Sequence, residues 1–213
     1  MSPAMTALLA GTVAFGLLAG CKIVPNPDPD SAAAPLDDDQ RMALLAAEIF
    51  DSRLPQHVAR HAVDPATLRA ALAQGLDVAG AAHGLRPASE GSPWNFILRA
   101  EGKVVEADRA SRAASLLLDS DGDGQGDLTV QLGPVVRGTA LRDALDFLNF
   151  TDFRDQIEFA KLARALNDQA HDRLALPQGD LTGLRLAVEG AMTLTSADAA
   201  WVMVPVALQV AAP

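Results

Sequence analysis

The spacing of apolar residues divides the chain into a helical part and a strand-rich part. From residue 37 onward, apolar residues recur three to four positions apart, which is the spacing of a helix with one buried face. A second helix is predicted after Asp64, where an N-cap aspartate precedes a proline at the first helical position, and it ends near Gly75. A short third helical turn follows up to His83. Residues 37–93 are therefore predicted to form an N-terminal helical segment.

After Trp94 the period of the pattern shortens to two, which is typical of strands that bury one face. The order of predicted elements is strand-strand-strand-helix-strand-strand. This is the order of an OB-type barrel, in which the helix closes one end, although other small α+β folds share it. We therefore predict an α+β fold with a five-stranded OB-like β-barrel and an inserted helix over residues 94–213. The predicted ranges are 95–105, 112–119 and 127–136 for the first strands, 139–149 and 152–174 for the helices, and 184–195 and 201–210 for the last strands.

Finer expectations concern the last strand and the longest helix. In the last strand, the even-numbered apolar residues from Val202 to Val210 are expected to face the interior. Pro205 cannot donate a hydrogen bond to a neighbouring strand, so it predicts an edge or a bulge and a barrel that is incompletely closed there. In the longest helix, an apolar stripe is expected to face the core. Its members are Phe153, Ile157, Ala160, Ala163 and Leu166.

The N-terminal residues form an uncharged, apolar segment that ends at the single cysteine. The run from Ala4 to Ala19 is long enough for a signal peptide but marginal for a membrane span. An aliphatic residue and two small residues then precede Cys21, which resembles a bacterial lipobox. We therefore expect a lipoprotein signal peptide over residues 1–20 and acylation of Cys21, which anchors the protein in the lipid bilayer. No Lys or Arg precedes the apolar run, which leaves room for a start codon further upstream.

The segment behind the cysteine is rich in proline and acidic residues and offers nothing from which to build a core. Residues 21–36 are therefore predicted to be a lipidated tether, stiffened locally by polyproline-like geometry. Lys22 is not the aspartate that retains lipoproteins at the inner membrane of enteric bacteria, so the outer membrane is favoured. We expect the folded part on the periplasmic face of the cell envelope.

Composition excludes some classes of partner. The 213 residues carry a net charge of −10, with 17 Lys+Arg against 27 Asp+Glu, and the basic residues are scattered. Such a chain repels nucleic acid, and the aromatic fraction of 4% leaves few rings for base stacking. One cysteine cannot form a disulfide within the chain. Nucleic acid is therefore not an expected partner.

An acidic run between the second and third predicted strands has oxygen donors at alternate positions and a glycine at the sixth. Loops that bind a hard cation such as Ca²⁺ supply oxygen ligands at alternate positions and use a glycine at the sixth position to make a tight turn. The run resembles the Asp-x-Asp-x-Asp-Gly-x-x-Asp loops of extracellular β-propeller proteins, but Val130 stands where an EF-hand has its bidentate glutamate. An acidic hairpin turn that uses Gly and Asp for positive φ is the alternative, and both remain open. The candidate Ca²⁺ ligands are Asp119, Asp121, Asp123, Gln125 and Asp127.

Enzyme signatures are weak. His57 and His61 have a helical spacing that zinc proteins use, but Val58 replaces the glutamate of the H-E-x-x-H motif and no third ligand is evident. The pair is therefore interpreted as part of a solvated helix face. The sequence contains no nucleophile elbow, phosphate loop or dinucleotide fingerprint. We predict a protein that is not an enzyme and has no organic cofactor.

The junction between the third strand and the following helix concentrates guanidinium, amide and carboxylate groups. Such groups readily assemble hydrogen bonds to a polar ligand, although the Arg and Asp residues also have the option of pairing with each other on the surface. A small polar ligand is predicted to bind here. The candidate ligand-binding residues are Arg112, Arg137, Thr139, Arg142, Asp143, Asp152 and Gln156.

The same junction carries a resemblance to a known family. The run GPVVRGTALRDALDFLNFTDFRDQIEFAKLARALN at residues 133–167, with KVVEADRASRAASLLLDSDGDG before it, resembles the predicted periplasmic lipoproteins known as domain of unknown function 2291. The resemblance covers nearly the whole chain and is specific at RGTALRD and DFRDQIEFA. It implies a bacterial lipoprotein of unassigned activity, often encoded beside sugar-type ABC transporter components, with no established catalytic residues.

These observations favour a non-enzymatic envelope lipoprotein that assists carbohydrate uptake by binding a small sugar-like solute or an ABC transporter component. One alternative is a structural docking module for another protein, with a hairpin stabilised by calcium. A second alternative is an envelope hydrolase, which would need two carboxylates that converge in a cleft.

Overall fold

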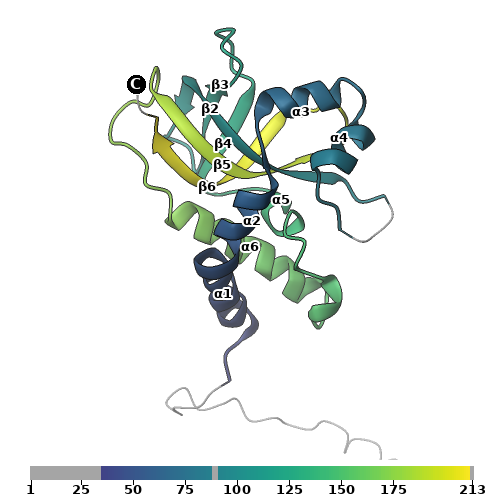
Figure 1. Ribbon diagram of the computed structural model, residues 1–213. Coiled ribbons are helices and arrows are strands. Elements are labelled where there is room, and N and C mark those ends of the chain that lie inside the picture. Colours follow the sequence, from purple (N-terminus) through teal and green to yellow (C-terminus); the bar gives the residue numbers. More distant parts are fainter. Residues whose placement is uncertain (1–34, 88–90, 212–213) are drawn as a thin grey trace, which may run out of the picture. The chain divides into compact units, whose positions relative to one another are not determined.

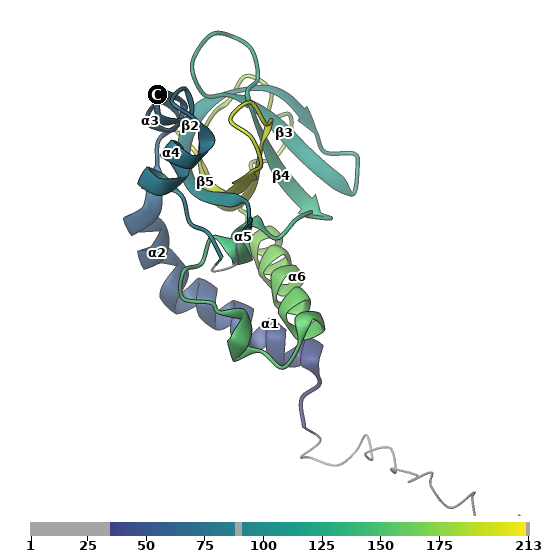
Figure 2. The same ribbon diagram turned by 90° about the vertical axis from the view of Figure 1, so that its right-hand side faces the viewer.

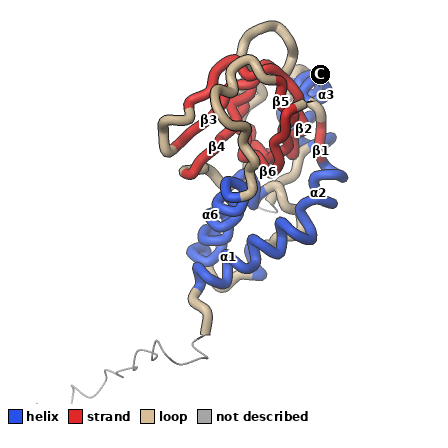
Figure 3. Tube along the Cα trace, turned by 90° about the vertical axis from the view of Figure 1, so that its left-hand side faces the viewer, coloured by secondary structure: helices blue, strands red, loops and turns tan. Residues whose placement is uncertain are grey.

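The computed structural model describes residues 35–87 and 91–211, so the predicted signal peptide, Cys21 and most of the predicted tether lie outside the described residues. Residues from Asp37 onward form one compact unit (Figure 1). The predicted helical segment and the predicted barrel both belong to this unit. Helices α1, α2 and α6 gather at one end of the strands (Figure 3).

The first helical stretch continues through α1, a π-helical turn and α2. It begins with a capping box, because the Asp37 side chain accepts from the backbone N–H of Gln40 at 2.8 Å and the Gln40 side chain accepts from that of Asp37 at 3.1 Å. The stretch continues through Pro55 because this residue lies at the start of α2, where a proline ring fits. As predicted, Asp64 caps α3. The bounds are α1 Asp38–Glu48, the π turn Ile49–Arg53, α2 Leu54–His61, α3 Pro65–Leu72 and α4 Leu76–His83.

Five long strands form a closed barrel, which confirms the predicted α+β, OB-like fold. The ring of pairings runs β2-β3-β4-β6-β5 and returns to β2 (Figure 2). The β4–β6 pairing is parallel, and the other pairings of the ring are antiparallel. A short strand, β1, adds to β2 outside the ring. The bounds are β1 Ala62–Val63, β2 Trp94–Asp108, β3 Ala113–Asp119, β4 Leu128–Pro134, β5 Arg185–Leu194 and β6 Trp201–Val210.

A bulge in β6 changes which residues face the barrel interior. Gly190 pairs with Pro205 and Glu189 with Ala207, so Val206 is the extra residue. The bulge predicted from Pro205 is confirmed, but the ring is complete, and the expected gap at this strand is wrong. The even-numbered inward set is also wrong, except at Leu208. Before the bulge, Trp201 and Met203 are the buried barrel residues, Val202 is 42% exposed, and Val204 packs in the cluster outside the barrel. The extra residue, Val206, shifts the alternation by one, so Leu208 faces inward, but Val210 at the end of the strand is 54% exposed.

Two hydrophobic clusters form the core. One fills the barrel and includes Phe96, Leu98 and Met203. The other lies between the outside of the barrel and the helices, and it joins Ile97 of β2 to Leu141 and further helical residues. Successive residues of β2 thus point to different clusters, as the alternation of side chains along a strand requires. Helices and barrel are therefore packed as layers of the same unit.

The helical region between β4 and β5 differs from its prediction. The expected helix over residues 139–149 ends early as α5 (Ala140–Asp143), and a 3₁₀ turn (Phe150–Asp152) precedes α6 (Gln156–Asp172). The predicted apolar stripe of α6 is correct at Ala163 and Leu166, which are buried, but Ile157 is 67% exposed and Ala160 is exposed. In the first turn of α6, the inward position belongs to a carboxylate, Glu158.

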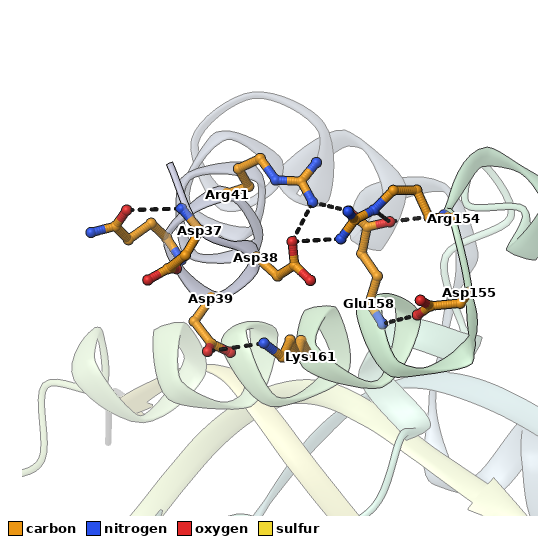
Figure 4. A network of polar contacts seen from close by, with 9 residues as sticks. Asp37, Asp38, Asp39, Arg41, Arg154, Asp155, Glu158 and Lys161 are labelled. Atoms are coloured by element: carbon orange, nitrogen blue, oxygen red, sulfur yellow. Dashed lines mark hydrogen bonds and ion pairs between the residues drawn. The ribbon is translucent and has the colours of Figure 1, made fainter. Parts of the chain in front are cut away.

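A network of ion pairs joins the start of α1 to the start of α6 (Figure 4). The buried carboxylate of Glu158 forms ion pairs with Arg41 at 2.6 Å and with Arg154 at 3.3 Å. Both arginines also pair with Asp38. The backbone N–H of Arg154 and the two guanidinium groups hold the pKa of Glu158 below its usual range. Lys161 adds a further pair with Asp39 at 3.0 Å. The network explains how a carboxylate can occupy a buried position in the first turn of α6.

Candidate functional site

The aspartate loop, residues 119–127, connects β3 to β4 and satisfies much of its own charge. Asp119 accepts from the backbone N–H groups of Gly122 at 2.7 Å and Gly124 at 3.0 Å. Partial burial raises the pKa of Asp119, but these hydrogen bonds outweigh it and leave the pKa below its usual value. The two glycines have positive φ, which lets the loop fold back on this carboxylate.

The loop brings three of the five predicted Ca²⁺ ligands together. Carboxylate oxygens of Asp119, Asp121 and Asp127 lie within 4.8 Å of one another. Asp123 instead accepts from the backbone N–H of Gln125 at 2.7 Å, and its other oxygen faces the Gln125 side chain. The structure thus provides a convergent set of three carboxylates, with Asp123 and Gln125 bonded to each other.

Asp127 also connects the loop to helix α3. It accepts from Ser120 and pairs with Arg69, whose guanidinium lies 4.7 Å from the ring centre of Trp201. A surface hollow of about 480 Å³ borders these side chains. Two of its charged groups, Arg69 and Asp127, form an ion pair with each other and so satisfy each other's charge.

At the junction of β4 and α5, some of the predicted ligand residues bind one another. The Thr139 hydroxyl donates to Asp143 at 2.6 Å, and Arg142 Nε donates to the same carboxylate at 2.8 Å. The Arg142 guanidinium also lies 3.8 Å from the ring centre of Phe159 and donates to its carbonyl at 3.2 Å. Within this cluster, the charges of Arg142 and Asp143 are paired with each other.

The other predicted ligand residues do not join the cluster. Arg112 precedes β3 and Arg137 follows β4, and both are exposed. Asp152 ends the 3₁₀ turn and Gln156 begins α6, and both are exposed too. The predicted set is therefore distributed over the surface around the junction.

A cavity of about 470 Å³, here called the junction cavity, opens beside the paired cluster. Of the predicted ligand residues, Arg142 and Asp143 line it. Sequence reasoning missed the residues from Asp146 to Thr151 because they were predicted to be helical or to form a break, which gave no indication of their orientation. It missed Arg86 and Phe159 because they come from segments distant in the sequence. The polar lining residues are Arg86, Arg142, Asp143, Asp146, Asn149 and Thr151, and the aromatic ones are Phe150 and Phe159.

The face of α2 that carries His57 is not solvated, so that prediction is wrong. The His57 side chain is fully buried, and its Nε2 lies 2.6 Å from the backbone oxygen of Ala144. His61, one turn later, is 29% exposed, and Asp146 lies beside both rings. The reason is that α2 packs against the turn after α5, a contact between distant segments that helical spacing alone does not reveal.

Comparison with known families assigns the chain to a class. The model of the family described as predicted periplasmic lipoprotein (DUF2291) matches residues 12–209. The chain belongs to this family. No curated protein matches the sequence. Among solved structures, an OB-fold protein from Thermotoga maritima is similar, with a TM-score of 0.64 and 15% identity over 84% of this chain and 100% of that chain. This likeness supports the fold and carries no functional information.

Membership of the DUF2291 lipoproteins supports an envelope-associated protein held by a lipid anchor. Cys21, the predicted site of acylation, falls inside the matched range but outside the described residues. Among the described helices, none is long and apolar enough to cross a bilayer. The junction cavity of this DUF2291 protein combines polar groups with the rings of Phe150 and Phe159. In the hollow beside the aspartate loop, by contrast, Arg69 and Asp127 pair with each other.

Proposed function

We propose that this DUF2291 protein is a non-enzymatic envelope lipoprotein that binds a small sugar-like ligand in the junction cavity and assists ABC-type carbohydrate uptake. The family resemblance, with its frequent neighbourhood to sugar-type transporter components, supplies the transport context. Lys22 after the acylated cysteine favours a location in the outer membrane. The proposal rests mainly on the lining of the junction cavity, where polar side chains lie beside the rings of Phe150 and Phe159.

The polar groups of the cavity fall into a fixed set and a free set. Arg142 and Asp143 are fixed by their mutual bond, and their side chains are only 12% and 15% exposed. Asn149 makes no capping bond at the 3₁₀ turn, and neither its side chain nor that of Thr151 has a hydrogen bond to any described residue. An amide and a hydroxyl that are free at the edge of a rigid charged pair are well placed to bind hydroxyl groups.

The aromatic groups favour a ligand with an apolar face. Phe150 is 47% exposed, and its ring packs edge-on against Phe159 at 5.6 Å between centres. An exposed ring beside hydrogen-bonding groups suits a pyranose, which presents C–H bonds on its faces and hydroxyls around its rim. Phe150 therefore offers an exposed aromatic face on which a sugar ring could stack.

Replacing Phe150 with alanine is expected to weaken sugar binding about tenfold, because a stacking contact of about 1.4 kcal/mol is lost. The measurement is calorimetric titration of the full-length lipoprotein in detergent with a panel of neutral mono- and oligosaccharides. Ile157→Ala is the control, since Ile157 is 67% exposed and does not line the cavity. Binding that Phe150→Ala leaves unchanged, or a panel without any binder, would contradict the proposal.

The aspartate loop is proposed as a secondary, structural Ca²⁺ site, on the observation that Asp119, Asp121 and Asp127 converge. Weak affinity of order 10⁻⁴–10⁻³ M is enough outside the cytoplasm. Calcium there would hold the β3–β4 hairpin and would not contact the junction cavity.

For wild-type protein, millimolar Ca²⁺ is expected to raise the melting temperature by roughly 2–8 °C, which corresponds to about 1–2 kcal/mol. Asp121→Ala should abolish this increase, whereas Asp168→Ala, an exposed position on α6, should preserve it. Thermal melts with Ca²⁺ and with a chelator provide the comparison. Equal melting of the wild type under both conditions would leave the loop as an acidic turn.

A further inference from the structure

Two histidines and an aspartate from distant parts of the sequence meet where α2 faces the turn after α5. His57 and His61 are one helical turn apart, with ring centres separated by 4.5 Å. Asp146 approaches both: Oδ1 lies 3.3 Å from His57 Nδ1, and Oδ2 lies 3.5 Å from His61 Nε2. One nitrogen from each ring and one carboxylate oxygen all lie within 4.8 Å of one another.

The hydrogen bond of His57 determines which of its nitrogens is free. Nε2 lies 2.6 Å from the backbone oxygen of Ala144. A carbonyl oxygen only accepts, so Nε2 carries the proton and donates it. In the neutral ring, Nδ1 therefore presents a lone pair toward Asp146 and His61.

This lone pair is buried and lacks a partner. His57 is fully buried, and Nδ1 makes no hydrogen bond, because the nearby carboxylate oxygen does not have hydrogen-bond geometry. A bare lone pair that faces a carboxylate is electrostatically unfavourable unless a positive charge lies between them.

We propose that His57, His61 and Asp146 form a three-ligand site for a divalent transition metal of the zinc type. Zinc binds histidine nitrogen at about 2.0–2.1 Å and carboxylate oxygen at about 2.0–2.2 Å, so ligand atoms on a tetrahedron around it are about 3.3 Å apart. Each histidine nitrogen lies at about this distance from one oxygen of Asp146, at 3.3 Å from Oδ1 and 3.5 Å from Oδ2, and a shift of the carboxylate would bring one oxygen to both. Neutral imidazole and carboxylate are also the ligand types that zinc accepts.

The surroundings provide the other features of a metal site. The Ala144 carbonyl fixes the tautomer and orientation of His57 from the far side of the ring, as outer-shell groups do for metal-bound histidines. The Asp146 side chain is 45% exposed, which gives an entry path and leaves a fourth position for water. Asp146 also lines the junction cavity, so the proposed metal site adjoins the space proposed for the ligand.

The test is a zinc titration of the full-length lipoprotein in detergent, prepared with a tag that contains no histidine and stripped with a chelator. Wild type is expected to bind one Zn²⁺ per chain. His61→Ala and the isosteric Asp146→Asn should weaken that binding by about 10–100-fold or more, since each removes a ligand from a partly exposed position. His83→Ala on α4 and Asp168→Ala at an exposed position of α6 are the matched controls and should bind as wild type does.

Cobalt supplies a second readout that a merely structural role would not change. The Co²⁺-loaded wild type should show the intense visible absorption of tetrahedral cobalt, and His61→Ala should lose it. Circular dichroism of the metal-free variants verifies that they are folded. Zinc binding that is absent, or that survives both ligand substitutions, or a weak octahedral cobalt spectrum overturns the proposal. The outcome is separate from the sugar proposal, because Phe150→Ala leaves all three metal ligands in place.

Discussion

Replacing Phe96 with alanine is expected to lower the free energy of unfolding by about 3–5 kcal/mol. Phe96 is among the largest side chains with no exposed surface, and it belongs to the cluster that fills the barrel. The closed ring of strands limits how far the surrounding residues can collapse into the space left by the ring. In a domain of this size, the melting temperature should fall by roughly 6–20 °C.

Val105 on the same strand provides the control for this prediction. It is 37% exposed, so Val105→Ala should change stability by no more than about 0.5 kcal/mol. Denaturant unfolding followed by tryptophan fluorescence measures both variants. A loss at Phe96 as small as the loss at Val105 would show that the barrel interior is not packed as described.

Leu141→Ala is expected to cost about 2–5 kcal/mol and to weaken both proposed binding sites. Leu141 is fully buried on α5 and packs in the cluster between helices and barrel. The same short helix carries Asp143, and the turn behind it carries Asp146. A cavity under α5 would loosen these two carboxylates together, whereas Phe96→Ala should leave their positions unchanged while the protein remains folded.

Combined measurements separate these effects. Leu44, 60% exposed on α1, supplies the control, and Leu44→Ala should retain the stability and zinc affinity of the wild type. Zinc and sugar titrations of Leu141→Ala are made well below its melting temperature. Unaltered affinities in a strongly destabilised Leu141→Ala protein would mean that α5 does not position the site.

The barrel could be predicted from the sequence because its strands carry the information locally. Alternation of apolar residues and turns rich in Gly and Asp indicated five strands in the correct order. The predicted orientation of β6 was wrong along most of the strand, because Val206 forms a bulge that shifts the alternation of side chains. The bulge lies opposite Gly190, where a Cβ would collide with the carbonyl oxygen of Val204. A bulge of this kind depends on the partner strand, which the β6 sequence does not specify.

The helical junction was harder to predict for a different reason. Leu141, Leu145 and Leu148 have the spacing of a helix, but Leu145 and Leu148 bond to carbonyls three residues back, so the chain forms turns. Packing of this segment against α2 and the barrel outweighs the local preference. The consequence extends to the site, since Asp146 meets His57 only through that packing, and sequence spacing could not reveal a third ligand.

The ion pairs between α1 and α6 also determine how the molecule would respond to a mechanical load. The folded unit begins at Asp37, directly behind the segment predicted to carry the lipid, so tension on the anchor enters at the first turn of α1. Asp38 and Arg41 hold that turn to Arg154 and Glu158. This turn is the part of the folded unit nearest to the anchor along the chain. We therefore expect tension to separate these ion pairs before it reaches the paired strands of the closed barrel.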